Sequence, residues 1–186
     1  MLTPNFSRLL GTLARGEDLT RTLTLICEMI EAYKAKQRAM ATVVMLDAST
    51  GELRTGAAPN LPERFSDAIN ALGIGPAAGT AGSAIYRRET IVVADIANDS
   101  LWKDHRDLAL DFSLHASWAV PIFDSSNSIL GALVLYFPKP RRAAAHTLDE
   151  ISELALIAGL AIERHQAEAE RAGRAQTLGT MVENLN

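Results

Sequence analysis

The chain has only one cysteine, Cys27, among its 186 residues. A disulfide within the chain is therefore impossible, and a zinc or iron–sulfur site built from several cysteines is excluded. No apolar run reaches the roughly 20 residues that a transmembrane helix needs. The opening stretch, MLTPNFSRLL, is also too short and too weakly charged for a signal peptide. We therefore expect a cytoplasmic chain without membrane contact, although a segment cut from a larger membrane-anchored protein has the same features.

Clusters of basic residues are also missing. Lys and Arg total 18 against 22 Asp and Glu, so the net charge is -4. Away from the expected helices, the only adjacent basic residues are Arg87-Arg88 and Arg141-Arg142. A nucleic-acid-binding protein normally presents a basic face, so we expect no nucleic-acid partner. What is present is an ordinary balance of 48% apolar and 22% charged residues, enough for the core of one domain with helical extensions.

Apolar spacing predicts helices at both ends of the chain and a mixed centre. Near the start, Leu19, Leu23, Ile26 and Ile30 alternate in steps of four and three, which places them on one helical face. Strands are expected at 40–47, 52–57, 90–94, 115–123 and 129–137, and short helices at 60–71, up to residue 87, and at 105–112. Because consecutive strands are joined as hairpins, the sheet should be antiparallel and the fold class α+β.

A long final helix is predicted to begin at a capping box formed by Thr147 and Glu150. Its first half has two apolar rows and suits packing on a sheet. Its second half keeps only a narrow seam, which suits pairing with another helix. The residues assigned to a dimer interface are Ile162, His165, Ala169 and Ala172. We accordingly divide the chain into an N-terminal helical extension (1–17), a central domain (18–164), and a C-terminal signalling or coiled-coil helix with its tail (165–186).

Four segments in order carry a resemblance to a known family. Residues 53–62 (LRTGAAPNLP) match a hairpin return and helix entry, and residues 74–87 (IGPAAGTAGSAIYR) match a glycine-rich turn and helix. Residues 92–109 (VVADIANDSLWKDHRDLA) match a strand and a "DI…D.LW" loop, and residues 115–137 match an "ACW..PI" strand followed by an "LG" strand. From about Asp18 the chain therefore resembles a GAF domain, of the subgroup found in bacterial sensor histidine kinases and GGDEF/EAL (cyclic-di-GMP) signalling proteins.

The resemblance implies a GAF-like, PAS-related fold. The antiparallel sheet is expected to be six-stranded, with the N- and C-terminal helices packed on one face and a ligand pocket on the other. It also implies a homodimer formed through the terminal helices, and an output domain (a kinase or GGDEF/EAL domain) in the same chain or in a partner protein. The subgroup often has cysteine where Ala81 and Ser117 stand here, which argues against the thiol or metal chemistry of such relatives.

Several side chains are candidates for the ligand site, each with a plainer structural alternative. The start of a helix at Gly79–Ser83 can present N–H groups to an anion, or it can simply pack on the sheet. Each tryptophan can be a pocket wall or core, and Asp95 can bind a ligand or cap a turn. The candidate ligand-binding residues are Gly79, Thr80, Ala81, Tyr86, Asp95, Trp102, His115, Ser117 and Trp118.

These features predict a non-catalytic sensory domain that binds an unidentified small molecule and signals through dimeric terminal helices. The alternative is a dimerisation module with a vestigial pocket and no ligand. Some GAF-like proteins reduce free methionine sulfoxide, but that chemistry uses several cysteines, so we expect no enzyme. We also expect no metal site, because His105 and His115 lack a spacing that supplies a ligand set. The cofactor stays unknown, since neither a cyclic-nucleotide signature nor a bilin attachment cysteine stands near the pocket.

Overall fold

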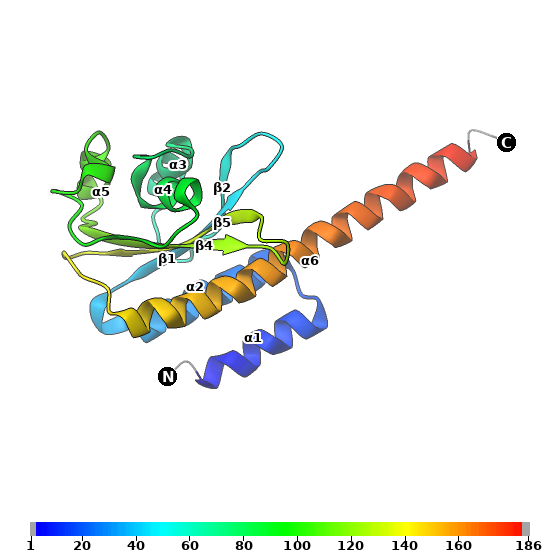
Figure 1. Ribbon diagram of the computed structural model, residues 1–186. Coiled ribbons are helices and arrows are strands. Elements are labelled where there is room, and N and C mark those ends of the chain that lie inside the picture. Colours follow the sequence, from blue (N-terminus) through cyan, green and yellow to red (C-terminus); the bar gives the residue numbers. More distant parts are fainter. Residues whose placement is uncertain (1–2, 184–186) are drawn as a thin grey trace.

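The computed structural model describes residues 3–183, which form three layers around one antiparallel sheet (Figure 1). The helices are α1 (Thr3–Arg15), α2 (Leu19–Tyr33), α3 (Glu63–Ala71), α4 (Gly79–Arg87), α5 (Arg106–Asp111) and α6 (Ala145–Glu183), with 3₁₀ turns at Ala35–Gln37 and Ser100–Trp102. The strands are β1 (Met40–Leu46), β2 (Leu53–Ala57), β3 (Ile91–Val93), β4 (Ala116–Phe123) and β5 (Ile129–Phe137). Helices α1, α2 and α6 lie on one side of the sheet, and α3, α4 and α5 lie on the other (Figure 1).

The sheet has five strands in the order β2-β1-β5-β4-β3, not the six that the family resemblance implied. All four neighbouring pairs are antiparallel, as the hairpin pattern predicted. The segment after β3 does not form a further strand, because the chain turns there: the Asn98 N–H donates to the Asp95 carbonyl at 3.2 Å. The Ala94 carbonyl instead accepts from the Arg141 N–H at 2.8 Å, in the connection before α6. Among residues 3–183, five β-rich segments therefore give five strands.

Alternation along β4 divides the core into two clusters. Trp118 and Val120 point toward the terminal helices and join a cluster built mainly from α2, α6 and β5. The intervening Ala119 points the other way, into a cluster beneath α3, α4 and α5. Because β4 is buried along its length on both faces, this strand contacts both clusters of the core.

A close approach seats α6 on the sheet at Gly159. This glycine is buried, and a Cβ added there would collide with the backbone carbonyl oxygen of Phe123 at the end of β4. Since backbone cannot move aside like a flexible side chain, only glycine allows α6 to lie this close. The first half of the helix is therefore held against β4 by direct contact.

The second half of α6 leaves the body of the protein. Ile162 is completely buried in the helix-side core, whereas the described residues beyond Glu163 are exposed or half-buried. Figure 1 shows this part of the helix projecting past the sheet. Assigning Ile162 to a dimer interface is therefore corrected: it faces its own domain, because the predicted seam continues the stripe that packs on the sheet.

The predicted segment boundaries at 1–17, 18–164 and 165–186 stay a prediction, and residues 1–2 and 184–186 lie outside the described residues. Within residues 3–183, no helix is both long and apolar enough to cross a membrane. The cytoplasmic location stays an expectation.

Candidate functional site

The candidate site lies on the sheet face covered by α3, α4 and α5. Its centre is a chain of buried polar groups. The Trp102 indole Nε1 donates a hydrogen bond to Thr80 Oγ1 at 2.9 Å, and the hydroxyls of Thr80 and Ser117 share a further hydrogen bond. All three residues are at most 1% exposed. The structure thus brings together three of the predicted ligand residues, from α4, the Ser100–Trp102 turn and β4.

Two further buried hydroxyls belong to this side of the molecule, and the sequence analysis did not select them. Ser83 on α4 and Tyr136 on β5 are both completely buried. Among the residues that the structure describes, neither hydroxyl has a hydrogen-bond partner. Burial raises the pKa of the Tyr136 hydroxyl, so this group stays a neutral donor and acceptor. The sequence signal was available, because Tyr136 shares strand parity with apolar Val134 and Ser83 follows Thr80 by one helical turn.

The start of α4 is tightly packed, so its N–H groups do not form an open anion site. Gly79 adopts a left-handed φ of +63°, and a Cβ placed on it would lie 3.4 Å from the Trp102 ring. Ala81 is 1% exposed. No side chain caps the helix start at Ala78. Small residues here let α4 approach the sheet, which is the plainer of the two interpretations considered for this segment.

The surrounding cluster is apolar. It holds the T-shaped contact between Phe65 and Tyr136, whose ring centroids are 5.0 Å apart, and a second edge contact between Phe65 and Phe112 at 5.4 Å. The buried polar residues whose burial the structure describes are all Ser or Thr, so no charged side chain among them is buried in this cluster. Its buried apolar members are Val44, Leu53, Leu61, Phe65, Ile69, Ala81, Ala84, Ile85, Ile91, Val93, Ile96, Trp102, Ala109, Leu114, Ala119, Ala132, Val134 and Tyr136.

Trp118 does not belong to this site. It lies on the opposite sheet face, 4.3 Å from Phe137 between ring centroids, and its Nε1 donates to the Arg141 carbonyl at 3.2 Å. Trp118 is therefore corrected from pocket wall to helix-side core. The reason is strand parity, since its neighbour Ser117 takes the site-facing position.

Three other predicted residues lie at the margin of the site. Tyr86 is 57% exposed at the end of α4. The Asp95 carboxylate accepts hydrogen bonds from the Ala97 N–H at 3.2 Å and the Asn98 side-chain amide at 2.7 Å, so it caps the turn. His115 is half-buried, and its backbone carbonyl accepts from Ile96 while its N–H donates to Phe137. These contacts shape the loop after β3 and leave the polar centre to Thr80, Ser117 and Trp102.

Cys27 is remote from the candidate site. It is completely buried in α2 on the helix side of the sheet. Burial is the main cause that raises the pKa of its thiol, and the charge of Glu31 adds to the effect. A thiol held neutral in this way is a poor nucleophile. Within residues 3–183, no group of three or more His, Cys, Asp and Glu side chains is placed to hold a metal ion.

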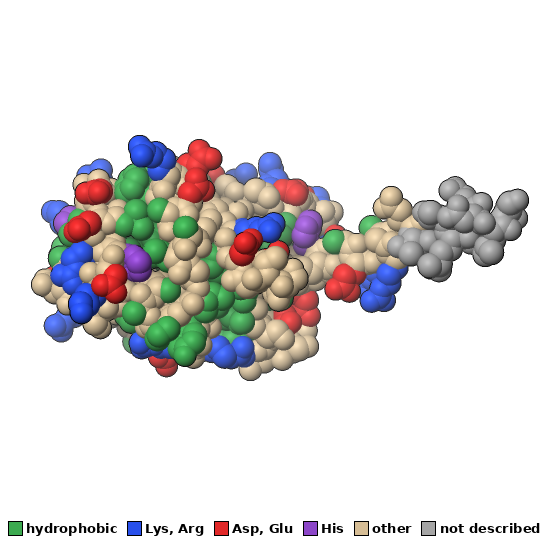
Figure 2. All heavy atoms as spheres, turned by 90° about the horizontal axis from the view of Figure 1, so that it is seen from above, with side chains coloured by type: hydrophobic (Ala, Val, Ile, Leu, Met, Phe, Trp, Pro, Cys, Tyr) green, Lys and Arg blue, Asp and Glu red, His purple; other side chains and the backbone are tan. Residues whose placement is uncertain are grey.

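The outer surface over the site carries charges of both signs. Figure 2, which views the molecule from the side of α3, α4 and α5, shows acidic and basic side chains interspersed around apolar surface. Arg87 contributes to this surface by donating to the Pro76 carbonyl at 3.2 Å and lying 4.0 Å from Glu89. Arg88 instead donates to the Asn127 carbonyl in the β4–β5 hairpin and lies over the Phe123 ring, so both arginines make contacts within the domain.

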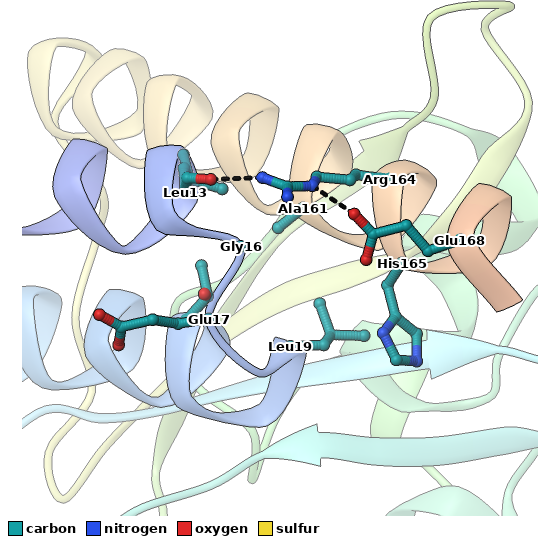
Figure 3. Close-up of a pocket in the computed structure, with 9 residues that line it drawn as sticks. Leu13, Gly16, Glu17, Leu19, Ala161, Arg164, His165 and Glu168 are labelled. Carbon is teal, nitrogen blue, oxygen red and sulfur yellow. Dashed lines mark hydrogen bonds and ion pairs between the residues drawn. The ribbon is translucent and has the colours of Figure 1, made fainter.

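A hollow lies where α6 leaves the core beside the corner between α1 and α2 (Figure 3). The Arg164 guanidinium crosses it, donating to the Leu13 carbonyl at the end of α1 and to Glu168 Oε1, the latter at 2.8 Å. His165, a predicted interface residue, is exposed and lines this hollow. Gly16 has a left-handed φ of +65°, and a Cβ there would collide with Arg164. The corner thus fixes the start of the projecting part of α6.

Helix α6 also carries two exposed leucines that the sequence analysis did not identify. Leu156 is 63% exposed and Leu160 is 51% exposed, and their four-residue spacing places them on one face. Ala169 and Ala172 are also exposed, but they lie on the continuation of the stripe that faces the core in the first half of α6. The helix therefore has its apolar outward face at Leu156 and Leu160, opposite the predicted seam.

Comparison with known proteins places this fold in a family. A GAF domain family model matches residues 16–163. Since the match spans most of the sequence, the chain belongs to the GAF domain family. It is similar to a methyl sulfide methyltransferase-associated sensor from Methanosarcina acetivorans, with 32% identity over 180 residues that cover 97% of this chain and 18% of the relative. The chain thus spans less than a fifth of that sensor's length.

Solved structures share the fold at low sequence identity. The GAF domain of a phosphoenolpyruvate-protein phosphotransferase from Coxiella burnetii has a TM-score of 0.71 and 19% identity, covering 91% of this chain and 96% of that one. A free methionine-R-sulfoxide reductase from Neisseria meningitidis, solved in complex with its substrate, has a TM-score of 0.61 and 18% identity, covering 81% of each chain. At such identities the likeness concerns the fold alone.

The reductase structures correct one expectation. We predicted from the cysteine count that the chain is not an enzyme, but proteins with this same fold include enzymes. The fold therefore leaves an enzymatic activity open, and that exclusion was wrong.

Proposed function

We propose that the chain is a sensory GAF domain that binds a small molecule between the sheet and α3–α5 and signals through α6. One observation carries the proposal: α6 is a single helix from Ala145 to Glu183 whose first half packs on the sheet and whose second half projects from it. A change in the sheet would reach the projecting half without crossing any loop. The similarity to a sensor protein supports the same role.

The physical route from site to helix is short. Ser117 takes part in the polar centre of the site, and its neighbour Trp118 lies in the helix-side core. Further along the same strand, the Phe123 carbonyl is the point that Gly159 of α6 approaches. A ligand that pulls on α4 and thereby on β4 would shift the seat of α6, since close-packed interiors transmit small displacements.

The signal is transmitted, in this proposal, by a homodimer formed through α6. An isolated helix that projects from a domain is marginal in water, and a second copy of α6 would cover Leu156 and Leu160 and continue along the exposed part of the helix. Exposed leucines at four-residue spacing suit such helix pairing. We propose that the paired helices pass the signal to an output domain, a kinase or a GGDEF/EAL domain, in a longer chain or in a partner protein.

A second candidate function is a dimerisation module without a ligand. The observation that favours it is the close packing of the candidate site, where Thr80, Trp102 and Ser117 already satisfy one another. The two candidates differ in whether purified protein carries a small molecule.

Native mass spectrometry of the protein purified without added ligand tests the proposal. We expect a dimer that carries additional small-molecule mass. A dimer without that mass favours the dimerisation module. A monomer at high protein concentration, without bound mass, contradicts both candidates.

A further inference from the structure

The two buried hydroxyls without partners point to the chemistry of the ligand. Eight polar residues are buried among those that the structure describes: Thr12, Thr22, Thr42, Ser66, Thr80, Ser83, Ser117 and Thr147. Seven of these eight hydroxyls make a hydrogen bond, and only Ser83 makes none. The hydroxyl of Tyr136, which is also completely buried, likewise makes no hydrogen bond. Since folded proteins satisfy nearly all buried hydroxyls, two exceptions on one side of the sheet need an explanation.

Both residues are neighbours of the polar centre of the candidate site. Tyr136 is the cross-strand partner of Ser117 in the β4–β5 register, so the two side chains stand next to each other on one face. Ser83 follows Thr80 by three residues on α4, which places it one turn further along the same helix face. Thr80 and Ser117 are hydrogen-bonded to each other. The residues that carry the unused hydroxyls are therefore neighbours of this bonded pair, one along α4 and one across the sheet.

We propose, on the basis of the function proposed above, that the site takes a small uncharged molecule that hydrogen-bonds to Ser83 and Tyr136. Burying an unpaired charge is costly, and the buried polar side chains among the residues whose burial the structure describes are all Ser or Thr, so none of them carries a charge that could pair with one. The remaining contacts would come from apolar groups such as Ile85, Val93 and Phe65. The ligand is therefore a neutral compound of few heavy atoms, with an oxygen or nitrogen acceptor and an apolar part.

Thermal unfolding of Tyr136→Phe tests whether the hydroxyl is reserved for a ligand. Removing an unsatisfied buried hydroxyl should raise the melting temperature of ligand-free protein by about 2 to 4 °C. The matched control is Tyr86→Phe, whose hydroxyl is on a side chain that is 57% exposed, and it should leave the melting temperature unchanged. A lower melting temperature for Tyr136→Phe means that the hydroxyl already has a partner such as a buried water, and overturns the proposal.

Binding is tested with acetamide as the neutral probe and acetate as the charged probe of equal size. Acetamide should cause saturable NMR shifts at the backbone amides of Ser83 and Tyr136, with a dissociation constant on the order of millimolar for so small a ligand. The affinity should fall at least tenfold in Ser83→Ala and in Tyr136→Phe. Acetate binding as well as acetamide, or acetamide causing no shift, overturns the ligand class. Neither result depends on the oligomeric state. A failure of this binding test therefore leaves the proposal of dimeric signalling to be tested by native mass spectrometry.

Discussion

At the residue scale, the hydrogen bond from Trp102 to Thr80 links the loop after β3 to α4. Trp102 and Thr80 are both essentially unexposed, and the bond length is 2.9 Å. We predict that Trp102→Phe destabilises the protein by about 1 to 3 kcal/mol, because it removes this donor and leaves a small void. Thr80→Val should remove the same bond from the other side.

The double variant provides the control. If the two groups interact as described, the effects of Trp102→Phe and Thr80→Val are not additive, and urea unfolding gives a coupling of about 0.5 to 1.5 kcal/mol. Strict additivity would show that the indole and the hydroxyl act independently.

Cys27 gives a pH-dependent prediction at the same scale. Burial raises the pKa of its thiol above the ordinary value of 9.0. As the pH rises past 9.0, the unfolded chain loses the thiol proton while the folded chain keeps it, so stability falls. Between about pH 7.5 and 9.5, the wild type should lose about 0.8 kcal/mol more than Cys27→Ala. Urea unfolding at the two pH values measures this, and equal losses in both proteins would contradict the buried neutral thiol.

At the element scale, the seat of α6 depends on Gly159. A methyl group there would meet the Phe123 carbonyl, so we predict that Gly159→Ala costs at least about 2 kcal/mol. The control is Gly173→Ala on the projecting half of the same helix, where an added Cβ meets nothing within 4 Å. That variant should leave stability unchanged or slightly raised. Chemical unfolding compares the two, and equal effects would mean that the close approach is not needed.

Much of the element pattern could be predicted from local signals. The positions of the two terminal helices and the five strands followed from apolar spacing and hairpin turns, because these depend on residues close in the chain. The sixth strand came from family likeness and was wrong, since the chain turns at Asp95. The predicted capping box at Thr147 was also wrong, because α6 begins at Ala145. Thr147 Oγ1 instead accepts a hydrogen bond from Lys34 Nζ at 3.1 Å, a contact between residues remote in sequence.

The candidate site was predictable only in part, for the same reason. Thr80, Trp102 and Ser117 were selected from the sequence, but which face of β4 carries the site depends on the whole sheet. That choice separates Ser117 from Trp118. Likewise, Tyr136 and Ser83 became notable only when their lack of partners was seen. A hydroxyl's partners cannot be predicted from spacing along the chain.

At the scale of the whole molecule, the outward face of α6 gives a prediction about assembly. Leu156 and Leu160 are the exposed leucines on this helix for which burial is described. We predict that replacing both with serine converts a dimer into a monomer in light scattering coupled to size-exclusion chromatography. Leu10→Ser is the control, because Leu10 is similarly exposed at 49% but lies on α1. A dimer that survives the double replacement would place the interface elsewhere.

The proposed signalling route requires that the face beneath α3–α5 is coupled to α6 across the sheet. Hydrogen–deuterium exchange of Ser117→Ala measures this coupling, because the variant breaks the bond to Thr80 without changing α6. The control is Thr90→Ala at an exposed position before β3. We predict faster exchange in Ser117→Ala both in α4 and in the sheet-packed half of α6, residues 145–162, with neither change in the control. Faster exchange confined to α4 and β4 would contradict this coupling.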